Sequence, residues 1–373
     1  METKVVKLDV TNIAPAKIKE AAAVINGGGL VAFPTETVYG IACRVKSKTL
    51  SNLNKLKGRR PDKYYTLHIY EKSEVGKYVP TIGIKAKKLV EMTWPGPVTI
   101  VFDLSDDDIN KQRENLEVEV FESLYKDNSI GIRCPDNAIA SMLLAEVGYP
   151  VVAPSANITG GEPAVEAKEA LAHFSGKIDM LIDGGPCKYK KNSTVVKISE
   201  GRFKLLRQGV YSQAELEAMS EIKFLFVCTG NTCRSPIAVG ILRKYLAKKL
   251  KCEIDQLDKI GYKVTSAGIM DMAGLPATAE AIATCDAKGI DIKAHKSQTL
   301  SQQLIEESDF IYAMGRVHCE RIVNLCPTLA NKCMLLAENE EIPDPIGQPQ
   351  EFYNNCAEMI EKAVKKRISE LVL

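Results

Sequence analysis

The sequence lacks the features that mark membrane, secreted and general nucleic-acid-binding proteins. No run of apolar residues approaches the roughly 18 that a membrane-spanning helix needs. The residues after Met1 have no basic region followed by an apolar core, so a secretory signal is not expected. The formal net charge is only +2, which does not indicate a surface built for nucleic acid. Together these absences predict a cytoplasmic protein that does not bind membranes.

Cysteine is plentiful, but its spacing suggests neither disulfides nor a metal cluster. The eleven cysteines are scattered along 373 residues, and no cysteine pairs or histidine groups stand at zinc spacing. Reduced thiols and no bound metal are therefore expected. Hydrophobic residues make up 45% of the chain and charged residues 26%, which is typical of a globular protein. At roughly 100–200 residues per domain, the length predicts two domains.

Both halves of the chain alternate apolar runs with helix-like stretches, which predicts α/β architecture for each half. The expected elements are strands at 29–33, 98–102, 130–133, 150–153, 180–183 and 224–227, and helices at 48–57, 212–220 and 236–249. Ser212 is a suitable cap for the short helix that precedes the second start of the pattern. We therefore predict one domain over residues 1–218 and another over 222–373.

The loop Cys228-Thr-Gly-Asn-Thr-Cys-Arg-Ser-Pro236 joins an apolar strand to a helix and carries residues suited to phosphate chemistry. A loop of this length can direct backbone N–H groups at a phosphate, and the helix N-terminus adds its positive end. The same field is expected to favour the thiolate of Cys228. Arg234 offers a planar fork for two phosphoryl oxygens. Ser235 can hydrogen-bond the departing thiolate.

A proton donor for such a reaction is found far downstream, at Asp344-Pro345. One carboxylate can protonate the leaving group and later activate water. Taken alone, Asp344 is more simply a surface turn, and Cys228 could be a buried structural cysteine, a metal ligand or one member of a redox pair with Cys233. The combination of loop, strand, helix and Asp-Pro favours a cysteine-dependent phosphatase.

These residues resemble the low-molecular-weight protein phosphatase family over nearly all of residues 222–373. Ser266-Ala-Gly268, Tyr312-Ala-Met314 and Phe352-Tyr353 agree with it. The resemblance implies a doubly wound, mainly parallel sheet. It also implies that Cys228 attacks phosphorus, Arg234 clamps the transition state and Asp344 is the general acid. The phosphate-binding loop would comprise Thr229, Gly230, Asn231, Thr232, Cys233 and Ser235.

Two positions bear on the substrate of this domain, a phosphorylated protein side chain. Tyrosine-directed members usually have isoleucine where Thr232 stands, whereas the loop here is similar to that of YwlE-type protein-arginine phosphatases. Ile346 replaces the aromatic residue that often follows Asp-Pro and packs on the substrate. Loss of that stacking contact weakens binding of a phenyl ring more than binding of a guanidinium. We therefore expect phosphoarginine. Phosphotyrosine remains an alternative, and a related arsenate reductase is a more distant one.

The first half contains basic and hydroxyl residues near predicted strand ends, a pattern that suits a polyanionic ligand. Pro34-Thr-Glu-Thr-Val-Tyr-Gly40 directly follows a strand, and Lys57-Gly-Arg59 follows a helix. Ser155-Ala-Asn157 forms a polar turn after another strand. Singly, each basic residue is more simply a solvated charge, and Trp94, the one tryptophan, is most simply core. The residues alone predict an anion-binding α/β domain.

Residues of about 10–215 resemble the YrdC-like threonylcarbamoyl-AMP synthases, whose Lys-x-Arg and Ser-x-Asn pairs are both present. The resemblance implies a twisted mixed sheet and a reaction of ATP, L-threonine and bicarbonate that releases pyrophosphate and serves threonylcarbamoyladenosine formation on tRNA. The implied ATP-binding residues are Lys57, Arg59, Lys63, Ser129, Ser155, Asn157 and Arg207. The implied threonine-binding residues are Thr37, His68, Arg133 and Ser193.

The same resemblance implies Mg²⁺ with the ATP, which needs few protein ligands, and no tightly bound cofactor. Possible partners are tRNA and proteins that modify it. The chain departs from the family at Lys63-Tyr-Tyr65, where Lys-Pro-Leu is usual. A non-catalytic RNA-binding module is the alternative for this half, although its basic residues are not interleaved with aromatic ones.

Overall fold

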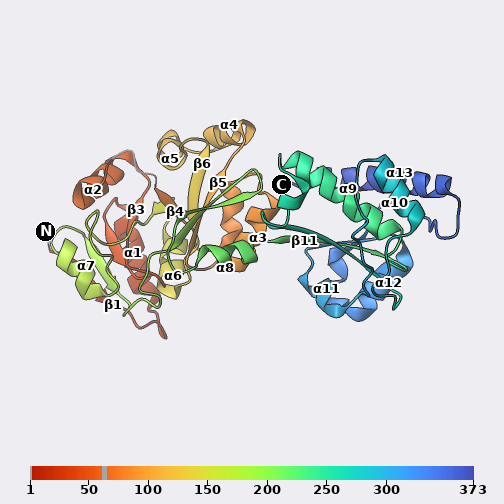
Figure 1. The fold of residues 1–373 in the computed structure, drawn as a ribbon. Helices are drawn as coiled ribbons and strands as arrows, with labels where there is room; N and C mark the ends of the chain where they lie inside the picture. Colours follow the sequence, from red (N-terminus) through yellow and green to blue (C-terminus); the bar gives the residue numbers. More distant parts are fainter. Residues whose placement is uncertain (1, 61–64) are drawn as a thin grey trace. The chain divides into compact units, whose positions relative to one another are not determined.

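The computed structural model describes residues 2–60 and 65–373, and within them the chain forms two compact units, 1–220 and 221–373. Each unit has its own sheet (Figure 1). At the end of the first unit, the helix predicted before the boundary is present as α8, Gln213–Met219. Ser212 caps it, because its side chain accepts from the backbone N–H of Glu215, and Glu215 bonds back. Among the described residues, no helix is both long and apolar enough to cross a membrane.

The first unit contains a mixed sheet of ten strands in its described residues, ordered β1-β8-β2-β3-β7-β4-β6-β5-β9-β10. The predicted mixed α/β fold is confirmed. Its strands are β1 Lys4–Lys7, β2 Val31–Phe33, β3 Gly40–Arg44, β4 Thr66–His68, β5 Val98–Asp103, β6 Ser129–Arg133, β7 Val151–Val152, β8 Met180–Asp183, β9 Thr194–Ser199 and β10 Arg202–Arg207. The helices before α8 are α1 Pro15–Asn26, α2 Ser47–Lys57, α3 Ile84–Thr93, α4 Asp106–Asn115, α5 Val118–Leu124, α6 Ala138–Glu146 and α7 Ala167–Phe174.

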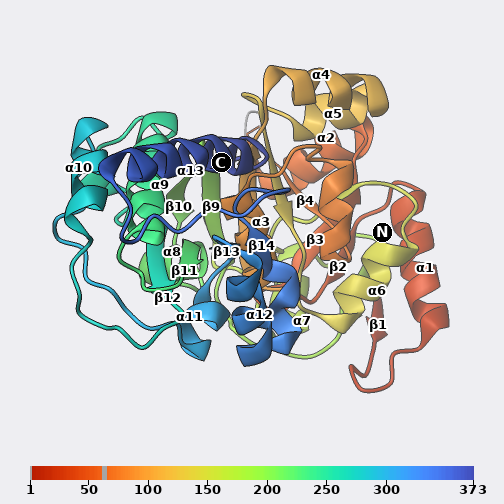
Figure 2. The same cartoon turned by 90° about the vertical axis from the view of Figure 1, so that its right-hand side faces the viewer.

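Helices cover both faces of this sheet, which explains why its central strands are apolar throughout. In β2, Val31 and Phe33 pack with α1 and α6, whereas Ala32 between them belongs to the cluster that α2, α3 and α7 cover. Figure 2 shows α1 and α6 in the same region of the unit. Successive side chains of a strand point to opposite faces, so each central strand contributes to both cores.

The second unit has a four-stranded sheet in which every pairing is parallel, ordered β12-β11-β13-β14. The predicted doubly wound, parallel arrangement is confirmed. Its strands are β11 Ile222–Cys228, β12 Tyr262–Gly268, β13 Phe310–Ala313 and β14 Cys333–Leu335. Its helices are α9 Arg234–Lys249, α10 Ala279–Ala287, α11 Gln302–Glu307, α12 Arg316–Leu325 and α13 Gln350–Ser369. Short 3₁₀ turns are η1 Lys72–Lys77 in the first unit, and η2 Ile254–Gln256 and η3 Pro327–Lys332 here.

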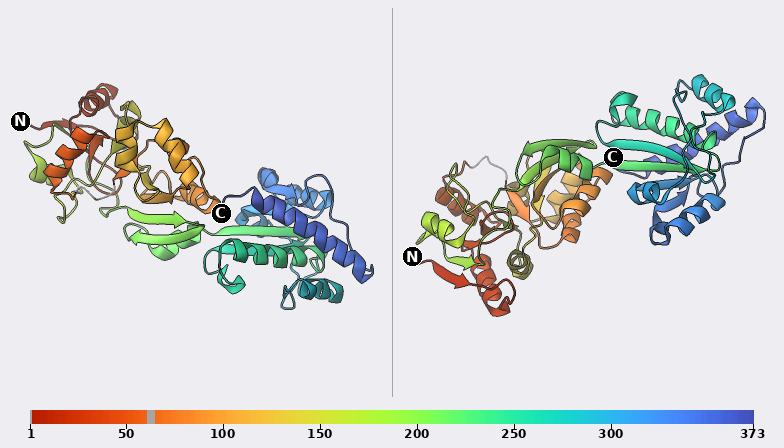
Figure 3. Two further views of the ribbon diagram at one scale, coloured as in Figure 1. Left: turned by 90° about the horizontal axis from the view of Figure 1, so that it is seen from above. Right: turned by 60° about the horizontal axis from the view of Figure 1, so that its bottom comes forward.

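Two helical layers enclose the second sheet. Figures 1 and 3 show α9, α10 and α13 on one face, with α11 and α12 on the other. Leu225 and Val227 of β11 pack on the α11–α12 side, while Phe224 and Phe226 alternate with them and are fully buried. Helix α9 begins at Arg234, two residues before the predicted start. The loop that follows Cys228 therefore ends directly in the first turn of α9, at the carboxyl edge of the sheet.

Candidate active sites

The loop between β11 and α9 folds into a tight cradle whose conformation depends on two small or permissive residues. Asn231 has a positive φ of 57°, a conformation that asparagine tolerates better than most residues. Gly268, at the end of β12, lies against the loop, and a Cβ there would stand 2.8 Å from the carbonyl oxygen of Thr229. The glycine thus lets the neighbouring strand support the loop from close range.

Asn231 also fixes the loop with its side chain. Its amide nitrogen donates to Ser235 Oγ and to Ser266 Oγ, both at 2.8 Å, and its Oδ1 accepts from the backbone N–H of Gln298 at 2.9 Å. The carbonyl oxygen of Asn231 contacts His295 Nε2 at 2.7 Å. These bonds tie the loop to β12 and to the segment 295–298, and so its shape is set before any ligand arrives.

Cys228 lies at the base of this cradle with only 2% of its surface exposed. Its sulfur is 3.0 Å from Ser235 Oγ and accepts from the backbone N–H of Asn231 at 3.2 Å. Burial raises the pKa of the Cys228 thiol, whereas the bonds from Ser235 and Asn231 and the charge of Arg234 act to lower it. The expectation that the loop favours the thiolate is thus opposed by burial, which has the larger effect on this pKa.

Arg234 reaches across the mouth of the loop and joins it to the Asp-Pro segment. Its NH1 donates to the carbonyl oxygen of Ile342 at 3.0 Å, and its NH2 donates to Thr229 Oγ1 at 2.9 Å. The same NH2 forms an ion pair with Asp344. The side chain of Arg234 is buried and that of Asp344 is 37% exposed, so the carboxylate stands at the solvent side of the cradle.

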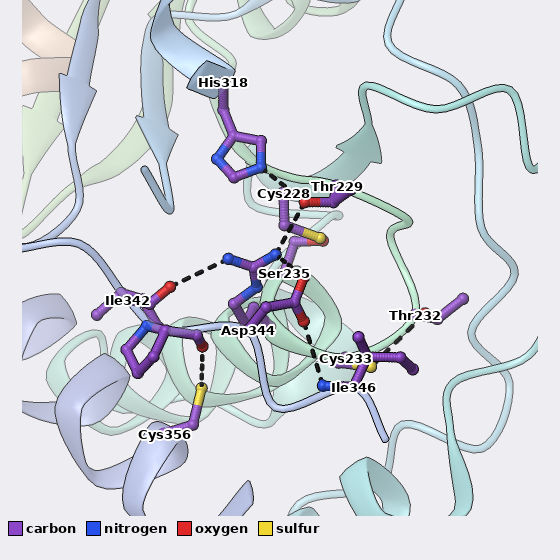
Figure 4. Close-up of polar contacts among 12 residues, drawn as sticks. Cys228, Thr229, Thr232, Cys233, Ser235, His318, Ile342, Asp344, Ile346 and Cys356 are labelled. Atoms are coloured by element: carbon purple, nitrogen blue, oxygen red, sulfur yellow. Dashed lines mark hydrogen bonds and ion pairs between the residues drawn. The ribbon is translucent and has the colours of Figure 1, made fainter. Parts of the chain in front are cut away.

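His318 belongs to this site although the sequence reasoning did not select it. It lies in the first turn of α12, is buried, and its Nε2 is 3.1 Å from Thr229 Oγ1 (Figure 4). Burial, together with the charge of Arg234, lowers the pKa of His318 to about 4, so the imidazole is neutral near pH 7. His318 could have been selected from its position shortly after the strand β13, because functional groups gather at the carboxyl ends of parallel strands.

The far rim of the cradle carries the two positions that bear on substrate choice. Thr232 is half-buried, and its hydroxyl is 3.6 Å from the sulfur of Cys233. Cys233 is itself buried, with its sulfur 3.5 Å from the hydroxyl of Tyr353. Ile346 is 55% exposed, and its backbone N–H donates to Asp344 Oδ1 at 3.3 Å. Figure 4 shows Thr232, Cys233 and Ile346 in one group beside Asp344.

In the first unit, a cavity opens among strand ends and is lined by hydroxyl and cationic groups. Among the described residues, those with polar side chains that line it are Thr35, Tyr39, Arg59, Tyr65, Thr66, His68, Thr99, Arg133, Ser155, Asn192, Ser193 and Arg207. The cavity therefore gathers three guanidinium groups and no carboxylate from the described residues. That balance suits a ligand with several negative charges.

Arg133 is held in place by a buried ion pair. Its NH2 lies 2.9 Å from Glu36 Oε1 and donates to Thr37 Oγ1 at 2.6 Å. The side chains of Arg133 and Glu36 are 7% and 2% exposed. Thr37 is fully buried, so its hydroxyl orients Arg133 from behind the cavity. Glu36, which the sequence reasoning quoted without a role, is the counter-charge of this arginine.

A second arginine, Arg207, also lines the cavity. Arg207 NH2 donates to the carbonyl oxygen of Ser193 at 2.9 Å and to its hydroxyl at 3.0 Å, and that hydroxyl is 3.1 Å from Thr99 Oγ1. His68 lies nearby with its Nδ1 3.1 Å from the carbonyl oxygen of Thr66. Burial, together with the charge of Arg133, lowers the pKa of His68 to about 3. The imidazole is therefore a neutral hydrogen-bonding group in this cavity.

Comparison with known proteins assigns each of the two units to a protein family. A model of the Sua5, YciO and YrdC family, described as telomere recombination, matches residues 23–209. A model of the low molecular weight phosphotyrosine protein phosphatases matches residues 223–372. The chain belongs to both families. Its first unit is the Sua5-like part and its second unit is the phosphatase-like part.

Individual relatives agree with this division. The threonylcarbamoyl-AMP synthase of Bacillus subtilis (strain 168) is 31% identical over 223 residues, which cover 59% of this chain and 62% of that protein. The chain thus spans about three fifths of that relative's length. The low molecular weight protein-tyrosine-phosphatase Etp of Escherichia coli (strain K12) is 33% identical over 160 residues, which cover 40% of this chain and 99% of that protein.

A solved structure shares the fold of nearly the whole chain. The crystal structure of Pyrococcus abyssi Sua5 complexed with L-threonine has a TM-score of 0.52 and 21% sequence identity. It covers 97% of this chain and 98% of that one. At this identity the likeness is one of fold.

Of the ten described residues that the Sua5-like motifs suggested, six line the cavity, whereas Lys57, Ser129, Asn157 and Thr37 do not. Lys57, expected on the nucleotide, is buried, and its ammonium donates to the carbonyl oxygens of Ser155 and Asn157. It therefore braces the Ser-x-Asn turn from behind. Ser129 does not line the cavity, because its hydroxyl donates to the carbonyl oxygen of Lys126 at 2.9 Å. Lys63 lies outside the described residues.

The Ser-x-Asn turn is itself internally bonded. Ser155 Oγ donates to Asn157 Oδ1 at 2.5 Å, and Asn157 Nδ2 donates to the carbonyl oxygens of Ile158 and Gly161 at 2.9 and 2.6 Å. Asn157 is buried, whereas Ser155 lines the cavity. The asparagine thus shapes the turn, and the serine is the member of the pair that a ligand can reach.

Proposed function

We propose that the protein is a bifunctional enzyme. Its first unit makes L-threonylcarbamoyladenylate from ATP, L-threonine and bicarbonate for tRNA modification. Its second unit removes phosphate from a phosphorylated protein side chain, with phosphoarginine as the favoured substrate. The observation that carries the phosphatase proposal is the buried Cys228 sulfur at the base of a loop whose Arg234 forms an ion pair with Asp344 of the downstream Asp-Pro segment.

The geometry supports a two-step reaction at phosphorus. In the first step the Cys228 thiolate bonds to phosphorus while the bond to the leaving group breaks, and Asp344 supplies the proton that the leaving group takes. Arg234 and the loop N–H groups bind the charge on the phosphoryl oxygens. In the second step Asp344 takes a proton from water, the water oxygen bonds to phosphorus, and the sulfur leaves.

Ser235 is placed to assist both steps. Asn231 Nδ2 donates to Ser235 Oγ, which leaves the hydroxyl hydrogen of Ser235 directed to the sulfur 3.0 Å away. A hydrogen bond to sulfur stabilises the thiolate more than the thiol. It therefore offsets the burial that raises the pKa of Cys228, and it eases the departure of the sulfur in the second step.

The preference for phosphoarginine rests on Thr232 and Ile346. A threonine hydroxyl at the rim can accept a hydrogen bond from a guanidinium or hold the attacking water, which an isoleucine cannot do. The exposed Ile346 gives the rim an apolar surface but no aromatic ring to stack on a phenyl group. Both features favour a guanidinium over a phenyl leaving group.

The decisive test compares hydrolysis of phosphoarginine and phosphotyrosine peptides by the full chain. Thr232→Ile is expected to move the ratio of kcat/KM toward phosphotyrosine by about tenfold, the effect of one polar-to-apolar change in a specificity pocket. Thr265→Ile, at an exposed position of β12, is the matched control. Cys228→Ser is expected to abolish both activities. An unchanged ratio in Thr232→Ile contradicts the phosphoarginine preference, and full activity of Cys228→Ser contradicts the mechanism.

The synthase proposal rests on the cavity of the first unit. The guanidinium groups of Arg59 and Arg207 suit nucleotide phosphates, and Arg133 with Thr37, His68 and Ser193 suits an amino acid with a carboxylate. Since no described carboxylate lines the cavity, Mg²⁺ would be held mainly by the nucleotide, with Ser155 as a hydroxyl ligand. Bound there, the ion would neutralise phosphate charge.

Pyrophosphate release from ATP tests this activity, and we expect it to require both L-threonine and bicarbonate. Arg207→Ala should raise the KM for ATP about tenfold or more, the loss of one charge-assisted contact. Lys204→Ala, on the same strand and exposed, is the control. Release that does not depend on threonine would refute the synthase proposal. A gel shift of tRNA without any release would favour an RNA-binding module.

A further inference from the structure

Two cysteines that the phosphatase chemistry does not use lie in direct contact on the α11–α12 side of the second sheet. The sulfur of Cys333, at the start of β14, is 3.3 Å from the sulfur of Cys319 in α12. A disulfide needs about 2.05 Å between the sulfurs, so a small movement would join them. Both side chains are partly exposed, which leaves them accessible to small oxidants. Figure 2 shows α12 beside β14.

The contact also makes one of the two thiols the more reactive. The thiol of Cys333 donates its hydrogen to the sulfur of Cys319. This bond lowers the pKa of Cys319 and raises that of Cys333, while the nearby Glu320 and Glu341 act to raise the pKa of Cys319. The thiolate is the form that reacts with oxidants. Cys319 is thus the attacking sulfur, and Cys333 is the resolving one.

The pair is connected to the phosphate loop through one neighbouring residue. His318, directly before Cys319, has its Nε2 3.1 Å from Thr229 Oγ1. That hydroxyl in turn accepts from Arg234 NH2 at 2.9 Å. A displacement of the first turn of α12 therefore acts on the residue that clamps phosphate.

The direction of such a displacement follows from the sheet. Cys333 is paired with Ile311 within the sheet, whereas Thr229 lies beyond the carboxyl end of β11. Shortening the sulfur–sulfur distance draws Cys319 toward the body of the sheet, and His318 with it. The contact between His318 and Thr229 then lengthens, and hydrogen bonds weaken steeply with distance.

We propose that Cys319 and Cys333 are a peroxide-sensitive thiol pair whose disulfide weakens phosphate binding by the loop of the second unit. The Cys319 thiolate attacks one oxygen of a hydroperoxide, the O–O bond breaks, and the other oxygen leaves and takes a proton. The Cys333 sulfur then attacks the sulfur of the sulfenic acid, the S–O bond breaks, and water leaves with the Cys333 proton. With hydrogen peroxide, two thiols and one peroxide give one disulfide and two waters.

The first experiment maps the disulfide in the full-length Cys228→Ser variant, so that the nucleophile cannot react. This variant keeps ten of the eleven cysteines, and after hydrogen peroxide we expect eight free thiols and a peptide pair joined through Cys319 and Cys333. A dithiol should restore all ten. Cys319→Ser in the same background should lose the cross-link, whereas Cys252→Ser should retain it. Ten unreacted thiols at peroxide concentrations that fully inactivate the wild type would overturn the proposal.

The second experiment measures the Kd of inorganic phosphate for the Cys228→Ser variant by calorimetry. This arm rests on the proposed function, because it needs a loop that binds phosphate. We expect oxidation of the pair to raise the Kd about fivefold, which is the effect of losing one hydrogen bond. When Cys319→Ser or His318→Ala is added to this variant, we expect peroxide treatment to leave the Kd unchanged. Equal Kd values for the oxidised and reduced forms would overturn the coupling. No phosphate binding by the reduced form would instead count against the proposed function, and the mapping experiment would still decide whether the thiol pair exists.

Discussion

The buried ion pair between Glu36 and Arg133 offers a sharp test of how the first unit is stabilised. Its two side chains are 2% and 7% exposed, so the charge that remains after one partner is removed is poorly solvated. Removing one partner of a buried pair costs about 3–5 kcal/mol, because the remaining charge stays buried without compensation. Glu36→Gln keeps an oxygen that can accept from Arg133 NH2. We therefore expect Glu36→Gln to lower the free energy of unfolding by about 3 kcal/mol, the lower end of this range.

The single tryptophan makes this loss measurable in one unit alone. Trp94 is buried in the first unit, and its Nε1 donates to the carbonyl oxygen of Val98 at 2.8 Å. Its fluorescence therefore reports unfolding of that unit and is silent for the other. For a unit of this size, a change of about 1 kcal/mol shifts Tm by about 2–4 °C. Glu36→Gln should thus lower the Tm seen by tryptophan fluorescence by about 6–12 °C.

The matched control for this variant is Glu91→Gln, which removes an ion pair with Lys72 on the surface of the same unit. Those side chains are 54% and 42% exposed, and exposed pairs contribute only about 0–1 kcal/mol. Its Tm should therefore stay within about 4 °C of the wild type. Equal shifts in the two variants would refute the reasoning, since burial would then make no difference to the value of the pair.

Three further outcomes are expected. Because the pKa of His68 falls from 6.5 unfolded to about 3 folded, only the unfolded state takes up this proton between those values. Below pH 6.5, the free energy of unfolding of the first unit should fall by about 1.4 kcal/mol per pH unit more in the wild type than in His68→Gln. The urea midpoint of the wild type should therefore decline more steeply with acid, and equal declines in the two proteins would contradict this. Gly240→Ala should destabilise the second unit by about 1–3 kcal/mol in circular-dichroism unfolding, because the new Cβ would lie 2.5 Å from Ile290 Cγ2. This cost should exceed the gain from the better helix propensity of alanine. A gain in stability would show that the surrounding side chains move to relieve the contact. Ser212→Ala should remove the cap of α8 and cost about 1 kcal/mol in the fluorescence-detected transition, whereas an unchanged midpoint would mean that packing alone holds the helix.

The sequence predicted the mostly buried strands β2, β5, β6, β7, β8 and β11, but it missed the equally buried interior strand β3. Residues 29–33 and 224–227 are apolar without interruption, and they form the interior strands β2 and β11, each of which is paired on both sides. The edge strands β1 and β10 were not selected, since most of their residues are exposed and show no apolar run. A strand at an edge is defined by backbone pairing with its neighbour, which a linear pattern does not display.

The sites divide along a similar line. The phosphate loop was recognisable because its chemistry is carried by consecutive residues. By contrast, His318 and Glu36 act through partners that are distant in sequence, at Thr229 and Arg133. Lys57 was recognisable as a positive charge, but the sequence could not show where its long, flexible side chain points. Its ammonium binds two carbonyl groups about a hundred residues away in the chain.

The short junction between the units has a consequence for how the cell can adjust them. Helix α8 ends at Met219 and β11 begins at Ile222, so both units are translated from one message as one chain. Their molar ratio is fixed at synthesis, and altered transcription or turnover changes both in equal proportion. One unit can be turned down on its own only after synthesis, for example by a chemical change in the finished protein. The contact between Cys319 and Cys333 is a place where such a change would reach the second unit and leave the first intact.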